Sequence, residues 1–290
     1  MPEGHTLHRL ARLHRRRFAG HPLAVSSPQG RFAAGAALID GRVLESADAH
    51  GKHLFHGYGP DLVLHVHLGL YGAFTHGPVP PPEPRGQVRL RLVGPTHFAD
   101  LRGPTACELL TDAEAAAIRG RLGEDPLRDD ADPDRVWARI SRSRAPLATL
   151  LMDQSVVAGV GNVYRAEVLF RQGLDPQLPG RALTRAQWDA VWSDLVELLS
   201  DGVRRGRIET VRPEHDPRTA GADAAARAFY TYRRSGEPCL VCGTPIAHAE
   251  HLARNLFWCP GCQRPPRSPR RRTAAATRRR GSTTRAPAAG

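Results

Sequence analysis

Lysine is almost absent from this 290-residue chain, although the chain is strongly basic. It contains 41 lysines and arginines against 29 acidic residues, for a formal charge of +12, and Lys52 is its only lysine. Arginine presents a rigid planar fork, whereas lysine carries a compact ammonium on a flexible stem. In a chain that otherwise uses arginine for positive charge, the one retained lysine suggests that its ammonium matters at this position.

Long apolar runs are also missing, which bears on where the protein resides. No stretch of about 18 apolar residues occurs, so the sequence argues against a membrane span. The start, Met-Pro-Glu-Gly-His, holds no apolar segment of a secretory signal. We therefore expect a soluble cytoplasmic protein without a membrane partner.

Acidic residues are absent from the last part of the chain. Nine arginines lie between Arg264 and Arg285, so this segment carries nine of the twelve net positive charges. A composition of Arg, Pro, Ala, Ser and Thr cannot bury a core. We expect residues 264–290 to form a disordered basic tail that binds a polyanion, the alternative being an extension without function.

Cysteine is scarce, but its spacing is informative. Four of the five cysteines form two Cys-x-x-Cys pairs separated by sixteen residues, the spacing of a four-cysteine zinc site: Cys239, Cys242, Cys259 and Cys262. Their thiolates fill a tetrahedron around one Zn²⁺ and leave no open position, so the metal is structural. Disulfides are the alternative, which an intracellular location disfavours. Cys107 is interpreted as a buried apolar residue.

Hydropathy patterns divide the rest of the chain into a strand-rich and a helix-rich part. Apolar residues at helical spacing predict an amphipathic helix over residues 7–18. Alternation over 62–68 and 88–92 predicts antiparallel strands of a sandwich or barrel, joined through a proline-rich loop at 78–84. Helical patterns follow at 113–122, 133–153, 162–172 and 185–199. Residues 204–227 lack periodicity and are predicted to be a mobile connector.

The first chemical candidate is the start of the chain. If Met1 is removed, Pro2 becomes a free secondary amine, and an α-amine titrates at about pH 7.7–8.0, far below a lysine side chain. Such an amine can attack an electrophilic carbon and form an iminium. Glu3 beside it can act as a general acid or base. An ordinary start sequence is the alternative.

Three further features can contact phosphate. Lys52 lies between expected strands, where a surface turn is the alternative. Gly159 and Gly161 precede a helix that opens at Asn162, so free backbone N–H groups can face an anion, whereas a plain helix–helix turn would bind nothing. Arg254 lies within the zinc loop, where it is either presented to a phosphate or simply solvated.

Taken together, these motifs resemble the formamidopyrimidine-DNA glycosylase/endonuclease VIII family. The resemblance rests on the start Met-Pro-Glu-Gly, the Gly-Lys of the strand region, the turn Gly-Val-Gly-Asn-Val-Tyr-Arg-Ala-Glu and the closing Arg-Asn-Leu-Phe-Trp-Cys-Pro-Gly-Cys-Gln. These segments occur in the family's order and span residues 1 to 263. The start Pro-Glu-Gly resembles the endonuclease VIII branch.

The resemblance implies a multidomain α+β fold. Residues 1–112 would form an N-terminal antiparallel β-sandwich with a flanking helix, and residues 113–227 a helix–two-turn–helix α domain. Residues 228–263 would form a C-terminal four-cysteine zinc-finger β-hairpin, followed by the tail. The family expectation is a monomer, associated with the nucleoid, that binds double-stranded DNA containing damaged bases or abasic sites in the cleft between its domains.

The resemblance also implies a bifunctional DNA glycosylase with AP-lyase activity in base excision repair. Pro2 would be the nucleophile on C1′ of the damaged nucleotide, Glu3 would protonate or relay at the opening sugar, and Lys52 would hold phosphate and sugar. Asn162 and Arg254 would bind the phosphates that flank the lesion. β-Elimination and δ-elimination would then release the sugar.

The remaining expectations concern the choice of substrate. Leu70 and Tyr71 are candidate wedges, by resemblance to the endonuclease VIII branch, that fill the gap left by an extruded base, core packing being the alternative. His5 and Thr6 stand where relatives usually carry proline and glutamate, and Gly69 stands where the branch often has a larger polar residue. We expect oxidised pyrimidines to be preferred, with oxidised purines left open.

The competing class is a non-catalytic, zinc-dependent protein that recognises damaged or abasic DNA by charge. The basic tail, Arg254 and the glycine-rich turn would serve such a protein equally well. Pro2 and Lys52 separate the two hypotheses, because phosphate binding alone explains neither residue.

Overall fold

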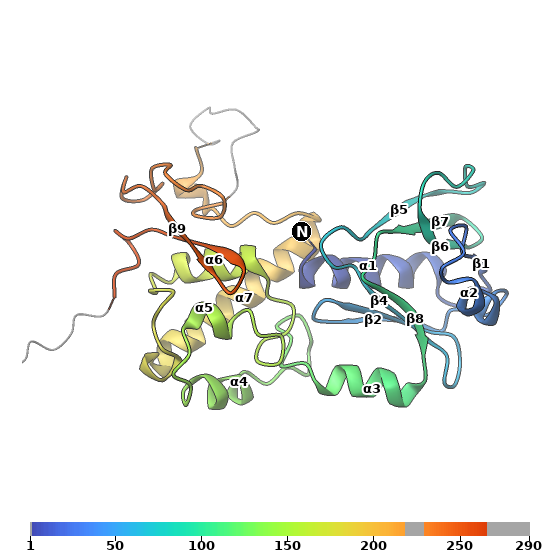
Figure 1. Cartoon of the computed structure of the whole chain (residues 1–290), viewed down its shortest axis with the longest axis horizontal. Coiled ribbons are helices and arrows are strands. Elements are labelled where there is room, and N and C mark those ends of the chain that lie inside the picture. Colours follow the sequence, from blue (N-terminus) through green and yellow to red (C-terminus); the bar gives the residue numbers. More distant parts are fainter. Residues whose placement is uncertain (1, 218–228, 266–290) are drawn as a thin grey trace, which may run out of the picture.

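The computed structural model describes residues 2–217 and 229–265. In chain order its main elements are α1 (Gly4–Phe18), β1 (Ala24–Ser26), α2 (Ala33–Ile39), β2 (Ser46–His50), β3 (His53–Gly57), β4 (Val63–His67), β5 (Ala73–Pro78), β6 (Val88–Val93), β7 (His97–Arg102), β8 (Ala106–Leu110), α3 (Asp112–Gly120), α4 (Pro133–Ile140), α5 (Leu147–Leu150), α6 (Asn162–Arg171), α7 (Arg185–Arg205), β9 (Ala247–His251) and β10 (Arg254–Trp258). Figure 1 shows two lobes, one containing β1–β8 and the other α4–α7 with the β9–β10 hairpin, and the N-terminus lies between them. Part of the expected connector, 218–227, and most of the expected tail, 266–290, lie outside the described residues.

The strand-rich lobe contains two four-stranded antiparallel sheets with the orders β1-β6-β7-β5 and β2-β3-β4-β8. Alternating apolar residues of both sheets point into one core, where Leu64 of β4 and Leu90 of β6 are buried together with Leu7 of α1. Cys107 of β8 belongs to the same core and is 9% exposed. The antiparallel sandwich, its flanking helix and the buried free cysteine are therefore confirmed.

The helical lobe differs from the sequence prediction at one point. A single helix was expected over 133–153, but α4 ends at Ile140 and α5 begins only at Leu147. Pro146 explains the break, because its nitrogen has no hydrogen to donate and its ring disfavours helical geometry in the preceding residue. The helix expected over 185–199 runs on to Arg205 and ends at Gly206, whose φ of 74° suits a residue without a side chain.

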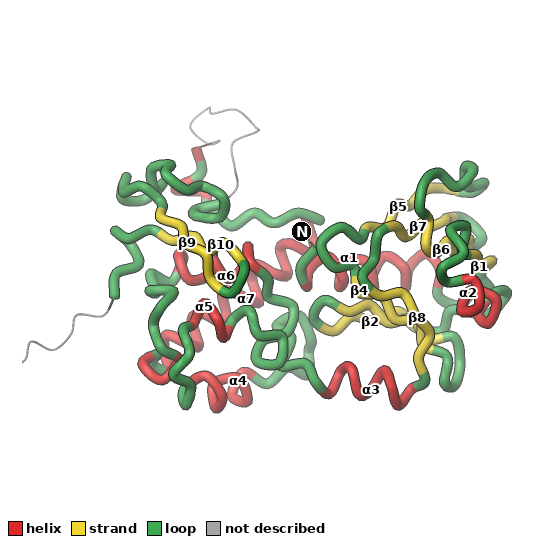
Figure 2. Tube along the Cα trace, in the orientation of Figure 1, coloured by secondary structure: helices red, strands yellow, loops and turns green. Residues whose placement is uncertain are grey.

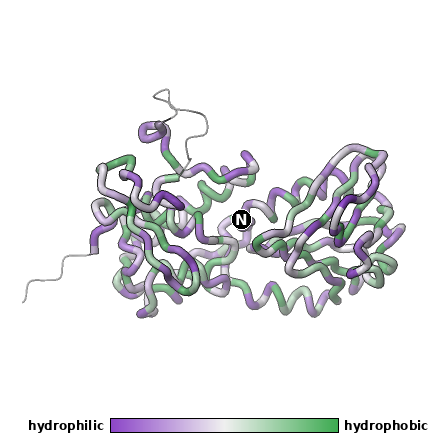
Figure 3. The backbone as a smooth tube through the Cα atoms, turned by 45° about the horizontal axis from the view of Figure 1, so that its top comes forward, coloured by the Kyte–Doolittle hydropathy of each residue, from purple (hydrophilic) through white to green (hydrophobic). Residues whose placement is uncertain are grey.

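The β9–β10 hairpin packs across α6, as Figures 1 and 2 both show. Phe257 of β10 lies in one buried cluster with Val163 and Phe170 of α6 and with the zinc-site residue Cys259. Figure 3 shows hydrophilic and hydrophobic residues alternating along both lobes, the pattern of elements with one buried face. Among the described residues, no helix is long and apolar enough to span a membrane.

Candidate functional site

Pro2, Lys52 and Arg254 line one cavity of about 260 Å³. Pro2 precedes α1, Lys52 lies in the turn between β2 and β3, and Arg254 opens β10, so the two lobes both contribute to the cavity. The other lining residues come mainly from α1, the β4–β5 loop and the segment after α5: Leu7, His67, Leu68, Gly69, Leu70, Thr105, Met152 and Gln154. Three residues that lie far apart in the sequence, each predicted to act on DNA, thus face the same space.

Glu3 is fully buried directly beside this cavity. Its carboxylate accepts hydrogen bonds from the backbone N–H groups of Gly161 and Val163, both at 2.9 Å, and from that of Tyr164 at 3.5 Å. These are N–H groups at the start of α6, so Glu3 caps a helix of the other lobe. Burial raises the pKa of Glu3, against the opposing effects of the Lys52 charge and these N–H groups.

The glycine-rich turn before α6 brings the N-terminus and the β2–β3 turn into close contact. The N–H of Gly4 donates to the carbonyl of Gly159 at 2.8 Å. A Cβ on Gly4 would lie 2.8 Å from Gly159 Cα, and one on Gly161 would lie 2.3 Å from Glu3 Cδ. Glycine is therefore required here because two backbones and a carboxylate approach one another closely. In the described structure the N–H of Gly159 donates to Gln154 and the N–H of Gly161 donates to Glu3, so both groups bind protein side chains.

Lys52 is anchored by its side chain as well as by its turn. Its Nζ donates to the carbonyl of Val160 at 2.7 Å. Burial lowers the pKa of Lys52 to about 8, which the charge of Glu3 opposes and the charge of Arg254 reinforces. A considerable fraction of this amine is therefore neutral at slightly alkaline pH.

Asn162 occupies the junction between α6 and the zinc hairpin. Its Nδ2 donates to the carbonyl of Asn255 at 3.0 Å, and its Oδ1 accepts a hydrogen bond from Arg165. Asn162 is 6% exposed, whereas Arg254, the residue before Asn255, is exposed and lines the cavity. In this arrangement Asn162 holds β10 in place, so that Arg254 is presented to the cavity.

Leu70 and Tyr71 form the exposed tip of the β4–β5 loop. Leu70 is 53% exposed and Tyr71 is 87% exposed, which excludes core packing for both side chains. Leu70 also lines the cavity with Pro2 and Lys52. Two large, exposed side chains at the edge of this cavity are suited to contact a nucleic-acid base.

His5 and Thr6 lie in the first turn of α1. His5 is 5% exposed, packs edge-on against Tyr164 with ring centroids 5.5 Å apart, and has its pKa lowered by burial to about 4. Thr6 Oγ1 and His5 Nε2 lie 3.3 Å apart. Thr6 carries no charge, so Glu3 is the carboxylate that this turn provides beside Pro2.

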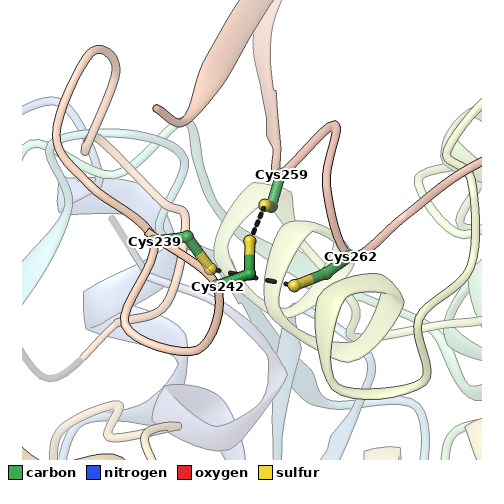
Figure 4. A group of neighbouring side chains, drawn as sticks. All are labelled: Cys239, Cys242, Cys259 and Cys262. Carbon is green, nitrogen blue, oxygen red and sulfur yellow. Dashed lines mark hydrogen bonds between the residues drawn. The ribbon is translucent and has the colours of Figure 1, made fainter. Parts of the chain in front are cut away.

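The four predicted zinc ligands converge at the base of the hairpin (Figure 4). Their Sγ atoms all lie within 4.8 Å of one another, with Cys239 and Cys262 at 3.9 Å and Cys242 and Cys259 at 3.4 Å. A tetrahedral Zn²⁺ with Zn–S bonds of about 2.3 Å requires sulfur separations of about 3.8 Å. These distances fit the metal and are too long for disulfides. The site holds one structural Zn²⁺.

Several residues of the site were not singled out from the sequence. Gln154 donates to the carbonyls of Met152 and Val160 at 3.0 and 2.9 Å and accepts from the N–H of Gly159 at 3.1 Å, so it organises the glycine-rich turn. His67 lines the cavity at the end of β4, where the alternating pattern marks it only as polar. A polar residue close to a glycine-rich turn was the available signal for Gln154.

Comparison with known families agrees with the geometry. Family models for the formamidopyrimidine-DNA glycosylase N-terminal domain, for its H2TH domain and for the zinc finger found in FPG and IleRS match residues 1–107, 122–213 and 236–265. These three parts define a zinc-containing DNA glycosylase of DNA repair. The chain belongs to the formamidopyrimidine-DNA glycosylase/endonuclease VIII family.

Individual relatives place the chain further within the family. It is 58% identical over 267 residues to Endonuclease 8 1 of Mycobacterium tuberculosis, covering 91% of this chain and 100% of that protein. It is 32% identical over 235 residues to the formamidopyrimidine-DNA glycosylase of Albidiferax ferrireducens, covering 78% and 84%. The solved complex of Lactococcus lactis Fpg with DNA containing an abasic site shares the fold, with a TM-score of 0.74 at 18% identity over 91% of this chain and 100% of that one.

Proposed function

We propose that the chain is a bifunctional DNA glycosylase and AP lyase that removes oxidised bases, pyrimidines in preference, through an iminium at Pro2. The observation that carries the proposal is the shared cavity, in which Pro2 faces Lys52, whose pKa burial lowers to about 8, and the exposed Arg254. A protein that only binds phosphate needs neither the proline nor a buried carboxylate beside it. The similarity to Endonuclease 8 1 and to a glycosylase solved with abasic-site DNA supports the same reaction.

Pro2 supplies the nucleophile once Met1 has been removed. Its neutral amine attacks C1′ of the damaged nucleotide, the glycosidic C–N bond breaks, and the base departs with the bonding electrons and takes up a proton. Opening of the sugar ring breaks the C1′–O4′ bond and leaves a protonated O4′ and an iminium between Pro2 and C1′. The iminium acidifies C2′, so loss of that proton expels the 3′-phosphate, and a second elimination expels the 5′-phosphate.

Glu3 and Lys52 are proposed to serve the proton transfers and the positioning of the sugar. Burial raises the pKa of Glu3, which favours the protonated carboxyl that would give its proton to O4′. Lys52 would exchange its bond to the Val160 carbonyl for one to phosphate or sugar. Because the pKa of Lys52 is lowered to about 8, its ammonium can lose a proton near pH 8.

The DNA is proposed to lie along the cavity between the lobes as a damaged duplex bound by one monomer. Arg254 and Asn162 would contact the phosphates beside the lesion. Leu70 and Tyr71 would occupy the space left by the extruded base, because stacking on an aromatic ring stabilises the neighbouring base by about 1–3 kcal/mol. The basic segment from Arg264 onward would add phosphate contacts that depend on salt.

Borohydride trapping tests the proposal. Wild-type protein is mixed with a duplex that contains one abasic site, and the reduced covalent complex is quantified. Pro2→Gly removes the secondary amine and its ring, and we expect trapping at least about 100-fold slower, since a misplaced primary amine remains. Pro22→Gly, which alters an exposed proline outside the cavity, is the matched control and should trap like wild type.

The same assay separates the alternative function and the choice of substrate. Binding of abasic DNA without any trapping by wild type would favour the non-catalytic DNA-binding protein. A panel of duplexes with single oxidised pyrimidines or purines, scored for strand cleavage, tests the expected preference for pyrimidines. Equal or faster cleavage at purines would contradict that preference while leaving the lyase reaction in place.

A further inference from the structure

The carboxylate of Asp125 joins three segments of the chain behind the cavity. Its Oδ2 accepts from the N–H of Gly51 and lies at the same 2.7 Å distance from Nε2 of His8, and its Oδ1 accepts from the N–H of Leu127 at 2.9 Å. Asp125 is 1% exposed. Gly51 immediately precedes Lys52, so this buried carboxylate holds the backbone from which the lysine of the cavity projects.

Asp125 is itself fixed to the glycine-rich turn. The N–H of Gly123 donates to the carbonyl of Gln154 at 2.8 Å, and the N–H of Ala158 donates to the carbonyl of Glu124 at 3.0 Å. The same turn supplies the Val160 carbonyl that accepts the hydrogen bond from Lys52 Nζ. Lys52 is therefore held at both ends to one scaffold, its backbone through Asp125 and its ammonium through Val160.

Gly51 leaves little freedom for a different arrangement. Its φ of 58° lies in the left-handed region, and a Cβ there would approach Ala158 Cβ and Gly159 N to 3.1 Å. The β2–β3 turn therefore packs directly against the glycine-rich turn, with no room for a side chain at position 51. A hydrogen bond to its N–H fixes the position of that fit, because an unpaired N–H at a buried site is costly.

His8 and two backbone N–H groups surround the carboxylate of Asp125. Burial raises the pKa of Asp125, but the hydrogen bond and charge of His8 and the two N–H groups outweigh burial and hold the pKa below its usual value. Burial lowers the pKa of Lys52, the charge of Glu3 opposes this effect and the charge of Arg254 reinforces it, so the link from Asp125 to Lys52 that the structure shows is the hydrogen bond to the Gly51 N–H. The charged groups on the other side of His8 line a separate cavity of about 290 Å³: Arg12, Arg15, Asp48, Arg128, Asp129 and Asp130.

We propose that Asp125 is a positioning residue for Lys52, which acts by holding the Gly51 N–H and is itself oriented by His8. The contribution of Asp125 to catalysis rests on the proposed function, because it requires that Lys52 binds the sugar-phosphate. The placement of Lys52 by Asp125 is independent of that function. Misplacement of a catalytic group by about 1 Å can lower a rate by about 100-fold.

The single lysine provides a direct readout of this placement. Lys52 carries the only side-chain primary amine of the chain, so reductive methylation followed by peptide mass spectrometry reports on its accessibility alone. Asp125→Asn keeps the shape of the side chain but replaces one carboxylate oxygen by an NH₂ group. In one orientation this group faces Gly51 and His8, and in the other it faces the N–H of Leu127, so a hydrogen bond to a backbone N–H is lost in either case. Asp130→Asn makes the same change of charge on an exposed side chain that pairs with Arg128, and is the matched control.

We expect Asp125→Asn to raise the methylation rate of Lys52 about tenfold and to lower the single-turnover cleavage of abasic DNA by about 10- to 100-fold. The Kd for the abasic duplex should change by less than about threefold, and Asp130→Asn should match wild type. All variants are compared well below their measured Tm, because a purely structural role would lower Tm without changing the rate of the folded protein. Unchanged methylation of Lys52, or faster methylation with an unchanged cleavage rate, would overturn the proposal.

Two provisions keep the test decisive. If Asp125→Asn does not fold, His8→Gln replaces it, because this change disturbs the orientation of Asp125 and should raise methylation about threefold; no change there would contradict the proposal. If wild type shows no cleavage and no trapping, the proposed function fails, and the methylation rates alone decide whether Asp125 positions Lys52.

Discussion

Two buried glutamates bind backbone N–H groups through the same helix, and one of them, Glu3, directly follows the cavity residue Pro2. Glu3 accepts three backbone N–H groups at the start of α6, and Glu167 on α6 accepts the N–H groups of Tyr230, Thr231 and Tyr232 at 2.7–2.9 Å. Both are fully buried. Glu167 also receives hydroxyl hydrogen bonds from Thr231 and Thr210. All the partners of Glu167 belong to segments that attach the zinc-finger region.

The difference between the two lies in what surrounds them. Glu3 is next to Pro2 in the chain and is influenced by the charge of Lys52, both of which face the cavity. The hydrogen-bond partners of Glu167 are backbone and hydroxyl groups of Thr210 and of residues 230–232. Burial and a full set of N–H donors are therefore common to both carboxylates, and the position beside Pro2 and Lys52 is what distinguishes Glu3.

The largest expected effect is on chemistry, from Glu3→Gln. The amide cannot carry the proton to the sugar, so single-turnover base excision should fall by about 100- to 1,000-fold, within the range for loss of a general acid. Quenched-flow measurement on a lesion duplex checks this. A rate within threefold of wild type would mean that Glu3 acts only as a cap of α6.

Glu167→Gln is the matched change and should affect stability instead. The NH₂ group of the amide would lie against backbone N–H groups that now donate to the carboxylate. We therefore expect a loss of about 2–3 kcal/mol in the free energy of unfolding. Denaturant titration measures it. The cleavage rate of the folded protein should stay near that of wild type, and a selective loss of rate would contradict the contrast.

Zinc removal extends the comparison to the hairpin that both Glu167 and the metal support. Cys259→Ser, or a strong chelator, should loosen β9 and β10 and so remove Arg254 from the cavity. We expect DNA binding weaker by about tenfold or more, measured by fluorescence anisotropy. A Cys107→Ser control changes a cysteine outside the metal site and should bind DNA normally.

Acid should affect the lobe that contains Glu3 before the lobe that contains Glu167. His14 of α1 and His56 of β3 are fully buried with a 3.0 Å contact, and burial lowers the pKa of His56 to about 3. The unfolded histidine titrates at about 6.5, so the stability it contributes is complete above that pH and is lost as the pH falls toward 3. One such histidine accounts for about 2 kcal/mol between pH 6.5 and 5. Hydrogen exchange at pH 7 and 5 should show earlier opening of β3 and α1 than of α6.

The smallest expected effect is that of Tyr71→Ala. Tyr71 is 87% exposed, so the free energy of unfolding should change by less than about 0.5 kcal/mol. Excision of a damaged base should slow by about tenfold, because the ring of Tyr71 no longer stacks on the base beside the extruded nucleotide. Cleavage at a preformed abasic site should slow less, since no base has to be extruded. Equal slowing on both substrates would contradict a role as a wedge.

Local patterns predicted much of the fold. The Cys-x-x-Cys pairs predict the zinc site, alternating apolar residues predict β4 and β6, and helical spacing predicts α1. Each of these patterns depends only on residues that are close together in the sequence. The break between α4 and α5 lies within one continuous helical period of apolar residues, and only Pro146 marks it in the sequence.

Long-range partners could not be predicted from a single sequence. Glu3 caps a helix that begins nearly 160 residues later, and Asp125 holds a turn more than 70 residues earlier. The residues next to Glu3 and Asp125 in the sequence do not indicate which distant segment each carboxylate binds. The resemblance to a family supplied the cavity residues Pro2, Lys52 and Arg254, but it gave no reason to select Asp125, Gln154 or the anchoring role of Glu167.

The proposed reaction requires that the nitrogen of Pro2 becomes bonded to C1′ of deoxyribose. Peptide mapping of the borohydride-reduced complex by mass spectrometry tests it most directly. We expect the sugar remnant on an N-terminal peptide that begins with Pro2. A remnant on Lys52, or a fully active preparation whose N-terminal peptide still begins with Met1, would contradict it.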